Sequence, residues 1–213
     1  MNKTKYKIIH AAITLFNELG LMNVRNQDIA KEAGMSLSNF NYHFKTKQDL
    51  VFAVIEYMKS VLQEKVYGNK VLIQEGQGLE ITKSYFEFEE QFRFFYLDTY
   101  NILQSYPELK IEMRQQIQEA ILVIKNLNYL AVGKGYLKPA PPEMPDLYDK
   151  LADQIWINNH FWFTQMEIRG LKEDIVLKGL DACVFISYPY LTEKGKQVYM
   201  GFIEKVKAEK NIV

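Results

Sequence analysis

The amino-acid sequence predicts an all-α protein, and three observations support this. Apolar residues recur at spacings of three and four, the period of an amphipathic helix, nearly throughout the 213 residues. No sustained alternation of apolar and polar residues, the pattern of a half-buried strand, is bounded by turn residues. Glycine and proline punctuate the periodic segments, for example at Gly20, Gly34, Pro107 and Gly170. Because 48% of the residues are apolar, the chain can also bury a sizeable core.

The N-terminal part of the chain predicts four helices. Gly20 ends the first of them, which has one apolar face, and Gly34 ends the second. Ser36 can cap the third by accepting a hydrogen bond from a free backbone N–H. The fourth would span roughly 30 Å at about 1.5 Å per residue, which is long enough to belong to two domains. The predicted ranges are 4–19, 26–33, 37–43 and 47–66.

The rest of the chain predicts a larger helical bundle. Pro107 breaks an aromatic-rich helical region, because proline cannot donate to the helical ladder. Residues 133–146 hold two glycines and four prolines, which indicates a loop. The predicted helices are 79–105, 108–130, 146–169, 173–188 and 193–208. We therefore expect a three-helix N-terminal domain, residues 1–48, joined by a long helix to a helical domain, residues 49–213.

Charge is spread unevenly along the chain. Residues 1–50 hold seven basic and four acidic residues, a formal charge of +3. The whole chain has 26 of each, so the remainder holds 19 basic and 22 acidic residues, a formal charge of −3. A basic head on a mildly acidic body fits a local polyanion-binding module, although a chance fluctuation in a small sample would look the same.

The other bulk features narrow the classes of function. The single cysteine, Cys183, excludes an internal disulfide framework, and its apolar neighbours favour a buried, inert thiol over a redox sensor. Neither a signal-peptide core nor an apolar run of about 18 residues is visible, so we expect a soluble, cytoplasmic protein without membrane contact. The histidines and the cysteine have no metal-ligand spacing, and the sequence lacks a Gly-rich phosphate loop, G-x-S-x-G and H-E-x-x-H. We therefore expect no enzyme activity, no metal and no cofactor.

The second and third predicted helices carry the most informative pattern, two short helices joined by a tight turn. Glycine suits the turn at Gly34, because it takes a positive φ at little cost. The face of the third helix is polar but holds no acidic residue, whereas a merely solvated face more often carries Glu and Lys. Its short side chains can donate to and accept from base edges or phosphates; they are Ser38, Asn39 and Asn41. This is the layout of a helix-turn-helix, whose second helix enters the major groove of DNA.

Residues 4–50 resemble the DNA-binding domain of TetR-family regulators in the order and spacing of their motifs. The matching pieces are Ile8…Ala11-Ala12…Leu15-Phe16…Gly20, Asp28-Ile29-Ala30…Ala33-Gly34-Met35-Ser36 and Phe40…Tyr42-His43-Phe44-Lys45…Lys47…Asp49-Leu50. The resemblance implies that four side chains read base edges and five anchor phosphates. The implied base-edge readers are Gln27, Leu37, Ser38 and Asn39, and the implied phosphate anchors are Asn26, Asn41, Tyr42, His43 and Lys47. Leu37 could contact a thymine methyl group or simply pack.

Two positions depart from the family pattern. Arg25 stands where the family usually has Thr or Ser to cap the second helix, which leaves Asn26 as an alternative cap. Ser38 stands where Gly is common, so the approach of the recognition helix is expected to differ slightly.

The resemblance also implies a homodimer on a palindromic DNA operator, with a variable helical domain that binds a small effector; repression is the family default. The last helices carry dense apolar surface that would suit either a dimer interface or a subunit core. The candidate interface residues are Ile155, Trp162, Val176, Leu180 and Val184. An aromatic stripe is more often plain core than a ligand site, but aromatic and embedded polar residues are the best candidates for effector contact. These are Phe92, Phe95, Tyr96, Trp156, Asn159 and His160.

The wealth of aromatic residues favours a largely apolar or aromatic effector. The alternative is a DNA-binding regulator that is controlled by a protein partner or that has no ligand.

Overall fold

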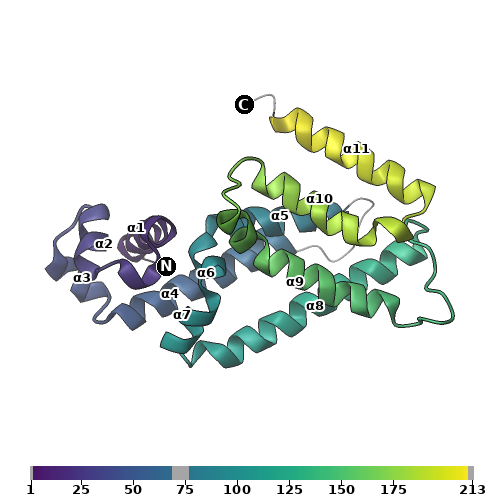
Figure 1. Cartoon of the computed structure of the whole chain (residues 1–213). Helices are drawn as coiled ribbons and strands as arrows, with labels where there is room; N and C mark the ends of the chain where they lie inside the picture. Colours follow the sequence, from purple (N-terminus) through teal and green to yellow (C-terminus); the bar gives the residue numbers. More distant parts are fainter. Residues whose placement is uncertain (1, 69–76, 211–213) are drawn as a thin grey trace. The chain divides into compact units, whose positions relative to one another are not determined.

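The computed structural model describes residues 2–68 and 77–210, and within these ranges it is helical and without strands, as predicted (Figure 1). One isolated antiparallel bridge pairs Leu137 with Leu191. The helices are α1 (Lys3–Leu19), α2 (Asn26–Glu32), α3 (Leu37–His43), α4 (Lys47–Val61), α5 (Gln77–Gln91), α6 (Arg93–Leu97), α7 (Thr99–Ser105), α8 (Leu109–Gly133), α9 (Leu147–Ile168), α10 (Ile175–Ser187) and α11 (Glu193–Lys210).

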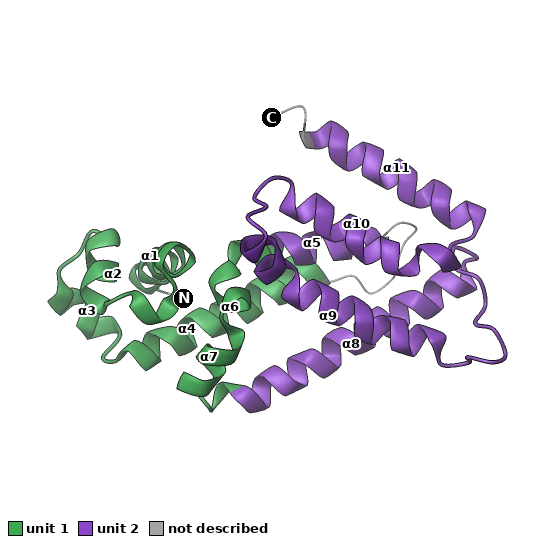
Figure 2. Cartoon of the chain, viewed as in Figure 1, with its two compact units in different colours: residues 1–69, 88–109 green, residues 70–87, 110–213 purple. Residues whose placement is uncertain are grey.

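The chain divides into two compact units, which Figure 2 distinguishes by colour. Unit 1 comprises Met1–Asn69 and Phe88–Leu109, and unit 2 comprises Lys70–Glu87 and Lys110–Val213. Unit 1 therefore extends well past the boundary expected at residue 48. The reason is packing, because α4 and the segment that holds α6 contact α1.

The first helix has the apolar face that the sequence predicts, and it ends at the predicted glycine. The Asn2 side chain caps α1 by accepting a hydrogen bond from the Thr4 N–H at 2.8 Å. Gly20 ends it with a φ of +79°, a conformation that L side chains rarely adopt. Ile8, Ala12 and Phe16 are fully buried, so this face of α1 forms the core of the N-terminal head.

The two short helices of the head, α2 and α3, are capped at their N-termini in different ways. Ser36 Oγ accepts a hydrogen bond from the Asn39 N–H at 3.2 Å, so the predicted cap of α3 is confirmed. The alternative cap Asn26 for α2 is wrong, because Arg25 is the N-cap residue and Asn26 is the first helical residue. Arginine has no side-chain acceptor to offer there. The start of α2 is instead held from the opposite side, where the Asp28 carboxylate accepts from the Arg25 N–H at 3.1 Å.

The fourth helix begins with reciprocal capping. Thr46 Oγ1 accepts from the Asp49 N–H at 3.0 Å, and the Asp49 carboxylate accepts from the Thr46 N–H at 2.9 Å. Regular α-helix ends at Val61, and a π-helical turn, Leu62–Tyr67, continues it to Gly68. The long fourth helix of the prediction is therefore present, but its last residues have π rather than α geometry.

The aromatic-rich region that was expected to be one helix over 79–105 is three helices. Phe92 separates α5 from α6 with φ −118° and ψ 33°, and Asp98 separates α6 from α7 with φ −138° and ψ 27°. Neither residue is glycine or proline, so the local sequence does not predict that a helix ends at either position. The break at Phe92 is stabilised by a side chain from α1, as described below.

Unit 2 has its own core, to which α8, α9, α10 and the loop between α8 and α9 contribute. One buried cluster joins that loop to the start of α9 and to the segment before α11; it comprises Leu137, Leu147, Tyr148, Leu151 and Leu191. The α9 and α10 helices pack closely at Gly179, where an added Cβ would lie 2.6 Å from the Phe86 ring and 2.8 Å from the Trp162 indole nitrogen. Cys183 is buried, as predicted, and burial raises the pKa of its thiol to about 12.

Candidate nucleic-acid interface

The recognition helix α3 is anchored by one aromatic side chain. Phe40 is fully buried, and its ring lies 6.1 Å from that of Phe44, which follows the helix. Phe40 is the only buried residue of α3. The other positions of α3 are thereby held at the surface of the head, exposed or half-buried.

The predicted base-edge readers on α3 and the predicted phosphate anchor Asn41 are all exposed. The side chains of Ser38, Asn39 and Asn41 make no hydrogen bond within the part of the chain that the structure describes. Leu37 is 44% exposed, so it does not pack into the head. The amide groups of α3 are therefore free to meet an external partner that offers both donors and acceptors, as base edges do.

The other expected contact residues lie around this helix with differing exposure. Tyr42 is 83% exposed and touches only the His43 ring, with the centroids 5.2 Å apart, among the aromatic contacts of the head. His43 and Asn26 are half-buried, and Gln27 is exposed at the start of α2. The structure thus brings these residues together on two helices of unit 1 that contact one another.

Lys47 differs from the other expected phosphate anchors because its ammonium group already has partners. The Lys47 Nζ donates a hydrogen bond to the backbone oxygen of Val24 and lies 4.7 Å from the centroid of the Phe16 ring. Burial lowers the pKa of Lys47 to about 8, although the nearby Asp28 carboxylate opposes that shift. These contacts favour a structural role, in which Lys47 ties the start of α4 to the segment before α2.

Two other lysines offer exposed cations beside α3. Lys45 comes just after Phe44, the residue that caps the end of the recognition helix, and the Lys5 Nζ lies 5.6 Å from the centroid of the Phe44 ring. Neither lysine is among the phosphate anchors that the family resemblance implies. The signal that could have found them was the excess of positive charge in residues 1–50.

We expect the salt dependence of DNA binding to separate the two kinds of lysine. Each phosphate contact adds about 0.9 to the slope of log affinity against log salt concentration, so Lys45→Met should lower that slope by about one for each bound chain. Lys47→Met should leave the slope unchanged, because its ammonium group is engaged inside the head. Duplex binding at four salt concentrations measures both slopes. The opposite pattern, with a lower slope only for Lys47→Met, would restore Lys47 as a phosphate anchor.

The six candidate effector residues divide between the units. Phe92, Phe95 and Tyr96 are buried in unit 1, where the Phe92 ring lies 4.9 Å from that of Phe88 and 6.1 Å from that of Tyr57. Their packing is that of a core.

The other three candidates lie on α9 in unit 2. Asn159 and His160 are buried, and the His160 ring stacks on Trp156 with centroids 5.0 Å apart and an interplanar angle of 15°. Burial lowers the pKa of His160 to about 4, so the ring is neutral at pH 7.

His160 should make the stability of the protein depend on pH. Its folded-state pKa lies below the ordinary value of 6.5, so on acidification the unfolded chain takes up a proton before the folded chain does. Stability from this group is complete above about pH 6.5 and is lost as the pH falls toward 4. We expect the free energy of unfolding in urea to fall by about 2 kcal/mol between pH 7 and pH 5 because of His160, and His160→Gln to remove that part. An equal loss in the wild type and the variant would contradict this assignment.

The candidate dimer residues also differ in exposure. Ile155 and Leu180 are buried within the single chain, with 6% and 0% of their surface exposed, so they belong to the subunit core. Trp162 is half-buried, and its indole N–H donates to the Ile175 backbone oxygen at 2.9 Å. Val176 and Val184 are half-buried as well. Apolar side chains that are exposed on α9, on α10 and just after it are Ile157, Phe161, Ile168, Phe185 and Tyr188.

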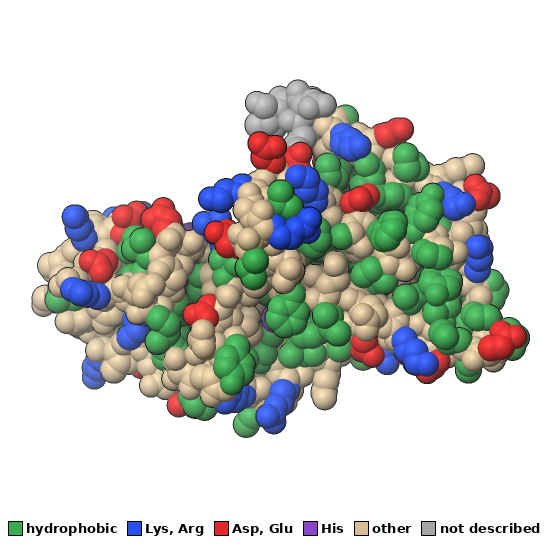
Figure 3. All heavy atoms as spheres, viewed as in Figure 1, with side chains coloured by type: hydrophobic (Ala, Val, Ile, Leu, Met, Phe, Trp, Pro, Cys, Tyr) green, Lys and Arg blue, Asp and Glu red, His purple; other side chains and the backbone are tan. Residues whose placement is uncertain are grey.

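The view in Figure 3 shows apolar side chains exposed over much of the visible face of unit 2. No helix in the described ranges is long and apolar enough to cross a membrane. In those same ranges, no three His, Cys, Asp or Glu side chains gather in a way that could hold a metal ion.

Comparison with known proteins agrees with the arrangement of the head. The sequence matches the family described as "Bacterial regulatory proteins, tetR family" over residues 8–54, and the TetR family described as "Bacterial transcriptional repressor" over residues 71–199. It is 28% identical over 141 residues to YerO of Bacillus subtilis, an uncharacterized HTH-type transcriptional regulator. That match covers 63% of this chain and 49% of YerO, so the chain spans about half the length of this relative.

Solved structures share the fold over nearly the whole chain. A TetR-family regulator from Marinobacter aquaeolei superimposes with a TM-score of 0.82 and 23% identity, covering 96% of this chain and 98% of that one. A regulator from Saccharomonospora viridis, solved in complex with choline, gives a TM-score of 0.70 and 17% identity, covering 91% and 100%. The second family match spans more than half of the chain, and the first covers the head that bears α3. The chain therefore belongs to the TetR family of bacterial transcriptional regulators.

Proposed function

We propose that this regulator is a repressor that binds a palindromic operator as a homodimer and is released by an effector bound in the C-terminal helical domain. The observation that carries the DNA-reading part is the exposed polar face of α3, where Ser38, Asn39 and Asn41 have no hydrogen-bond partner in the described chain. An amide can donate and accept at once, and an asparagine can bond an adenine through two atoms.

A pair of heads is needed for useful affinity. One small head buries little surface on one half-site, whereas two recognition helices roughly 34–36 Å apart reach successive turns of the major groove. A symmetric dimer would then select an inverted repeat. The exposed apolar residues of α9 and α10 support pairing through unit 2, and Phe185, at 74% exposed, is the strongest of them.

An effector would act through the spacing of the two heads. A ligand that binds better to a differently spaced dimer lowers DNA affinity by that difference in free energy. The buried polar pair Asn159 and His160, beside Trp156, supports a small-molecule site in unit 2. The S. viridis regulator was solved in complex with choline, and this likeness supports a small-molecule effector for this chain.

Selection from random duplexes tests the proposal. The purified full chain is incubated with a library at two salt concentrations, and the retained DNA is sequenced. We expect an inverted repeat and steep salt dependence, with two chains per recovered duplex in sedimentation. Recovery of a single, asymmetric half-site by one chain would contradict the homodimer, and recovery of nothing above background would contradict DNA reading by α3.

A further inference from the structure

The break between α5 and α6 is bonded to the first helix of the head. Phe92 leaves helical geometry there, so the adjoining backbone groups lose their helical partners. Asn17, in the last turn of α1, supplies replacements. Its Nδ2 donates to the Gln91 backbone oxygen at 2.9 Å, and its Oδ1 accepts from the Phe94 N–H at 3.0 Å. One amide side chain thereby satisfies a backbone group on each side of the break, and we call these two hydrogen bonds the Asn17 bridge.

Further contacts join the same two segments. The Arg93 guanidinium donates to the Asn17 backbone oxygen from Nη2 at 3.2 Å and from Nε at 3.4 Å. The Phe16 and Phe94 rings pack with their centroids 5.3 Å apart. Each of the two segments therefore donates hydrogen bonds to the other, and an aromatic contact lies beside these bonds. All of these residues belong to unit 1.

Phe16 extends this connection toward the DNA-binding end of the head. Its ring, fully buried, contacts Phe94 on one side and the Lys47 ammonium on another. Lys47 in turn bonds the Val24 backbone oxygen just before α2. A change in the backbone conformation of the break would therefore disturb contacts of α1, of the start of α4 and of the segment that leads into α2 and α3.

We propose that Asn17 is a positioning residue that couples the conformation of residues 91–98 to the DNA affinity of the recognition helix. The inference rests on the proposed DNA binding and names a route for its regulation. Coupling between two parts of a protein is reciprocal, so bound DNA must stabilise the break as much as an intact break favours DNA. An asparagine that only capped the break would stabilise residues 91–98 equally with and without DNA.

Hydrogen exchange with and without DNA tests the coupling. The full chain is compared, free and saturated with a duplex recovered in the selection above, by mass spectrometry of peptides from residues 91–98. In the wild type we expect the duplex to slow exchange there at least threefold. In Asn17→Ala we expect faster exchange, no further slowing by the duplex, and a three- to tenfold weaker duplex affinity.

Two further variants serve as a partial loss of the Asn17 bridge and as a control. Asn17→Asp preserves the acceptor for the Phe94 N–H but cannot donate to the Gln91 oxygen, so it should retain part of the coupling even if Asn17→Ala folds poorly. Asn101→Ala removes a side-chain bond to Asp98 at the other break, 2.6 Å long, and should leave the response to DNA unchanged.

The outcomes separate this inference from the proposed function. Duplex binding with equal slowing of exchange in the wild type and both Asn17 variants would overturn the coupling alone. Duplex binding by the wild type with no slowing at residues 91–98 would overturn it as well. Failure of the wild type to bind any duplex would overturn the proposed function and, with it, this inference.

Discussion

Replacing Phe40 by alanine is expected to lower the free energy of unfolding of the head by about 3–5 kcal/mol, the usual loss for a buried phenylalanine. Phe40 is fully buried and is the only buried residue of α3, so little else holds that helix on the head. Duplex binding should be lost along with the position of α3. Hydrogen exchange of peptides from residues 26–44 measures the stability, and a fluorescence anisotropy titration with a labelled duplex measures the binding.

Leu37→Ala is the matched control for this prediction. Leu37 lies on the same helix but is 44% exposed, so its truncation should change stability by less than about 0.5 kcal/mol. Any loss of DNA affinity in Leu37→Ala would then reflect contact with a base rather than unfolding. Wild-type exchange in Phe40→Ala would contradict the view that one aromatic side chain anchors the recognition helix.

A second large effect is expected at Gly195, near the start of α11. An added Cβ would lie 2.2 Å from the Tyr136 backbone oxygen and 3.1 Å from Leu191 Cδ2, and the backbone oxygen cannot rotate away. The same oxygen accepts a hydrogen bond from the Thr192 N–H at 2.9 Å, so moving it breaks the link between this loop and α11. We expect Gly195→Ala to destabilise unit 2 by about 3 kcal/mol, at the upper end of overpacking costs.

Tryptophan fluorescence during urea unfolding reports on this change, because both tryptophans, Trp156 and Trp162, lie in unit 2. Gly201→Ala is the control on the same helix. Its Cβ would meet nothing within 4 Å, so the higher helix propensity of alanine should stabilise the helix by about 0.5–1 kcal/mol. Equal behaviour of the two variants would contradict the close approach of α11 to Tyr136.

Most of the head could be predicted from the sequence because its determinants are local. Ser36 is followed three residues later by the N–H that it caps, and Gly34 stands where the turn takes φ +62°. Amphipathic periodicity likewise gave helices close to α1 and α11. Such signals lie within one or two turns of the structure that they specify.

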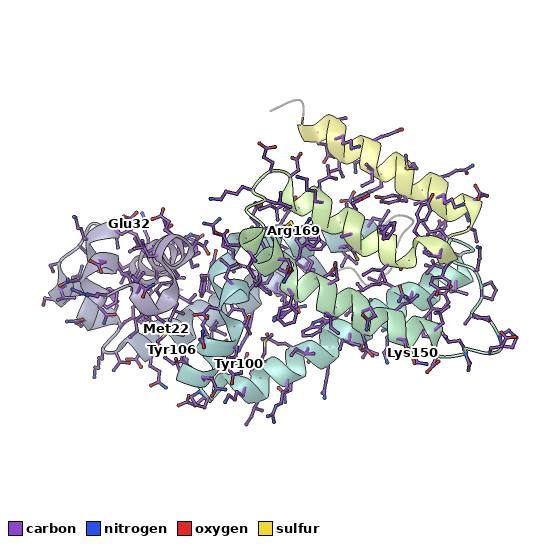
Figure 4. The ribbon with its side chains drawn as sticks, in the orientation of Figure 1. Met22, Glu32, Tyr100, Tyr106, Lys150 and Arg169 are labelled. Carbon is purple, nitrogen blue, oxygen red and sulfur yellow. The ribbon has the colours of Figure 1, made fainter. Side chains whose placement is uncertain are left out.

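The parts that sequence did not predict depend on distant partners. The break at Phe92 is satisfied by Asn17, 74 and 77 residues away from the backbone groups that it bonds. Tyr106, at the end of α7, packs its ring 6.3 Å from that of Phe52 on α4 and is among the side chains labelled in Figure 4. No pattern within residues 79–105 encodes these contacts, so the three helices there read as one.

The surroundings of the candidate site residues also depend on distant parts of the chain. The inward orientation of Lys47 follows from Val24 and Phe16, which lie 23 and 31 residues earlier in the chain. Leu180 is buried within one chain. Periodicity alone could not distinguish this from burial in a dimer interface, because a subunit core and an interface both favour an apolar residue.

We expect Asn39 on α3 to read base edges, and the sequence preference of an Asn39 variant measures that role. The random-duplex selection is repeated with Asn39→Ala and, as its matched control on the same helix, Tyr42→Ala. We predict that Asn39→Ala loses the preference at one or two positions in each half-site and keeps the rest, at a cost of about 1–3 kcal/mol to the preferred sequence. Tyr42→Ala should weaken binding to all sequences alike. A wild-type sequence preference in Asn39→Ala would contradict the reading role of this face of α3.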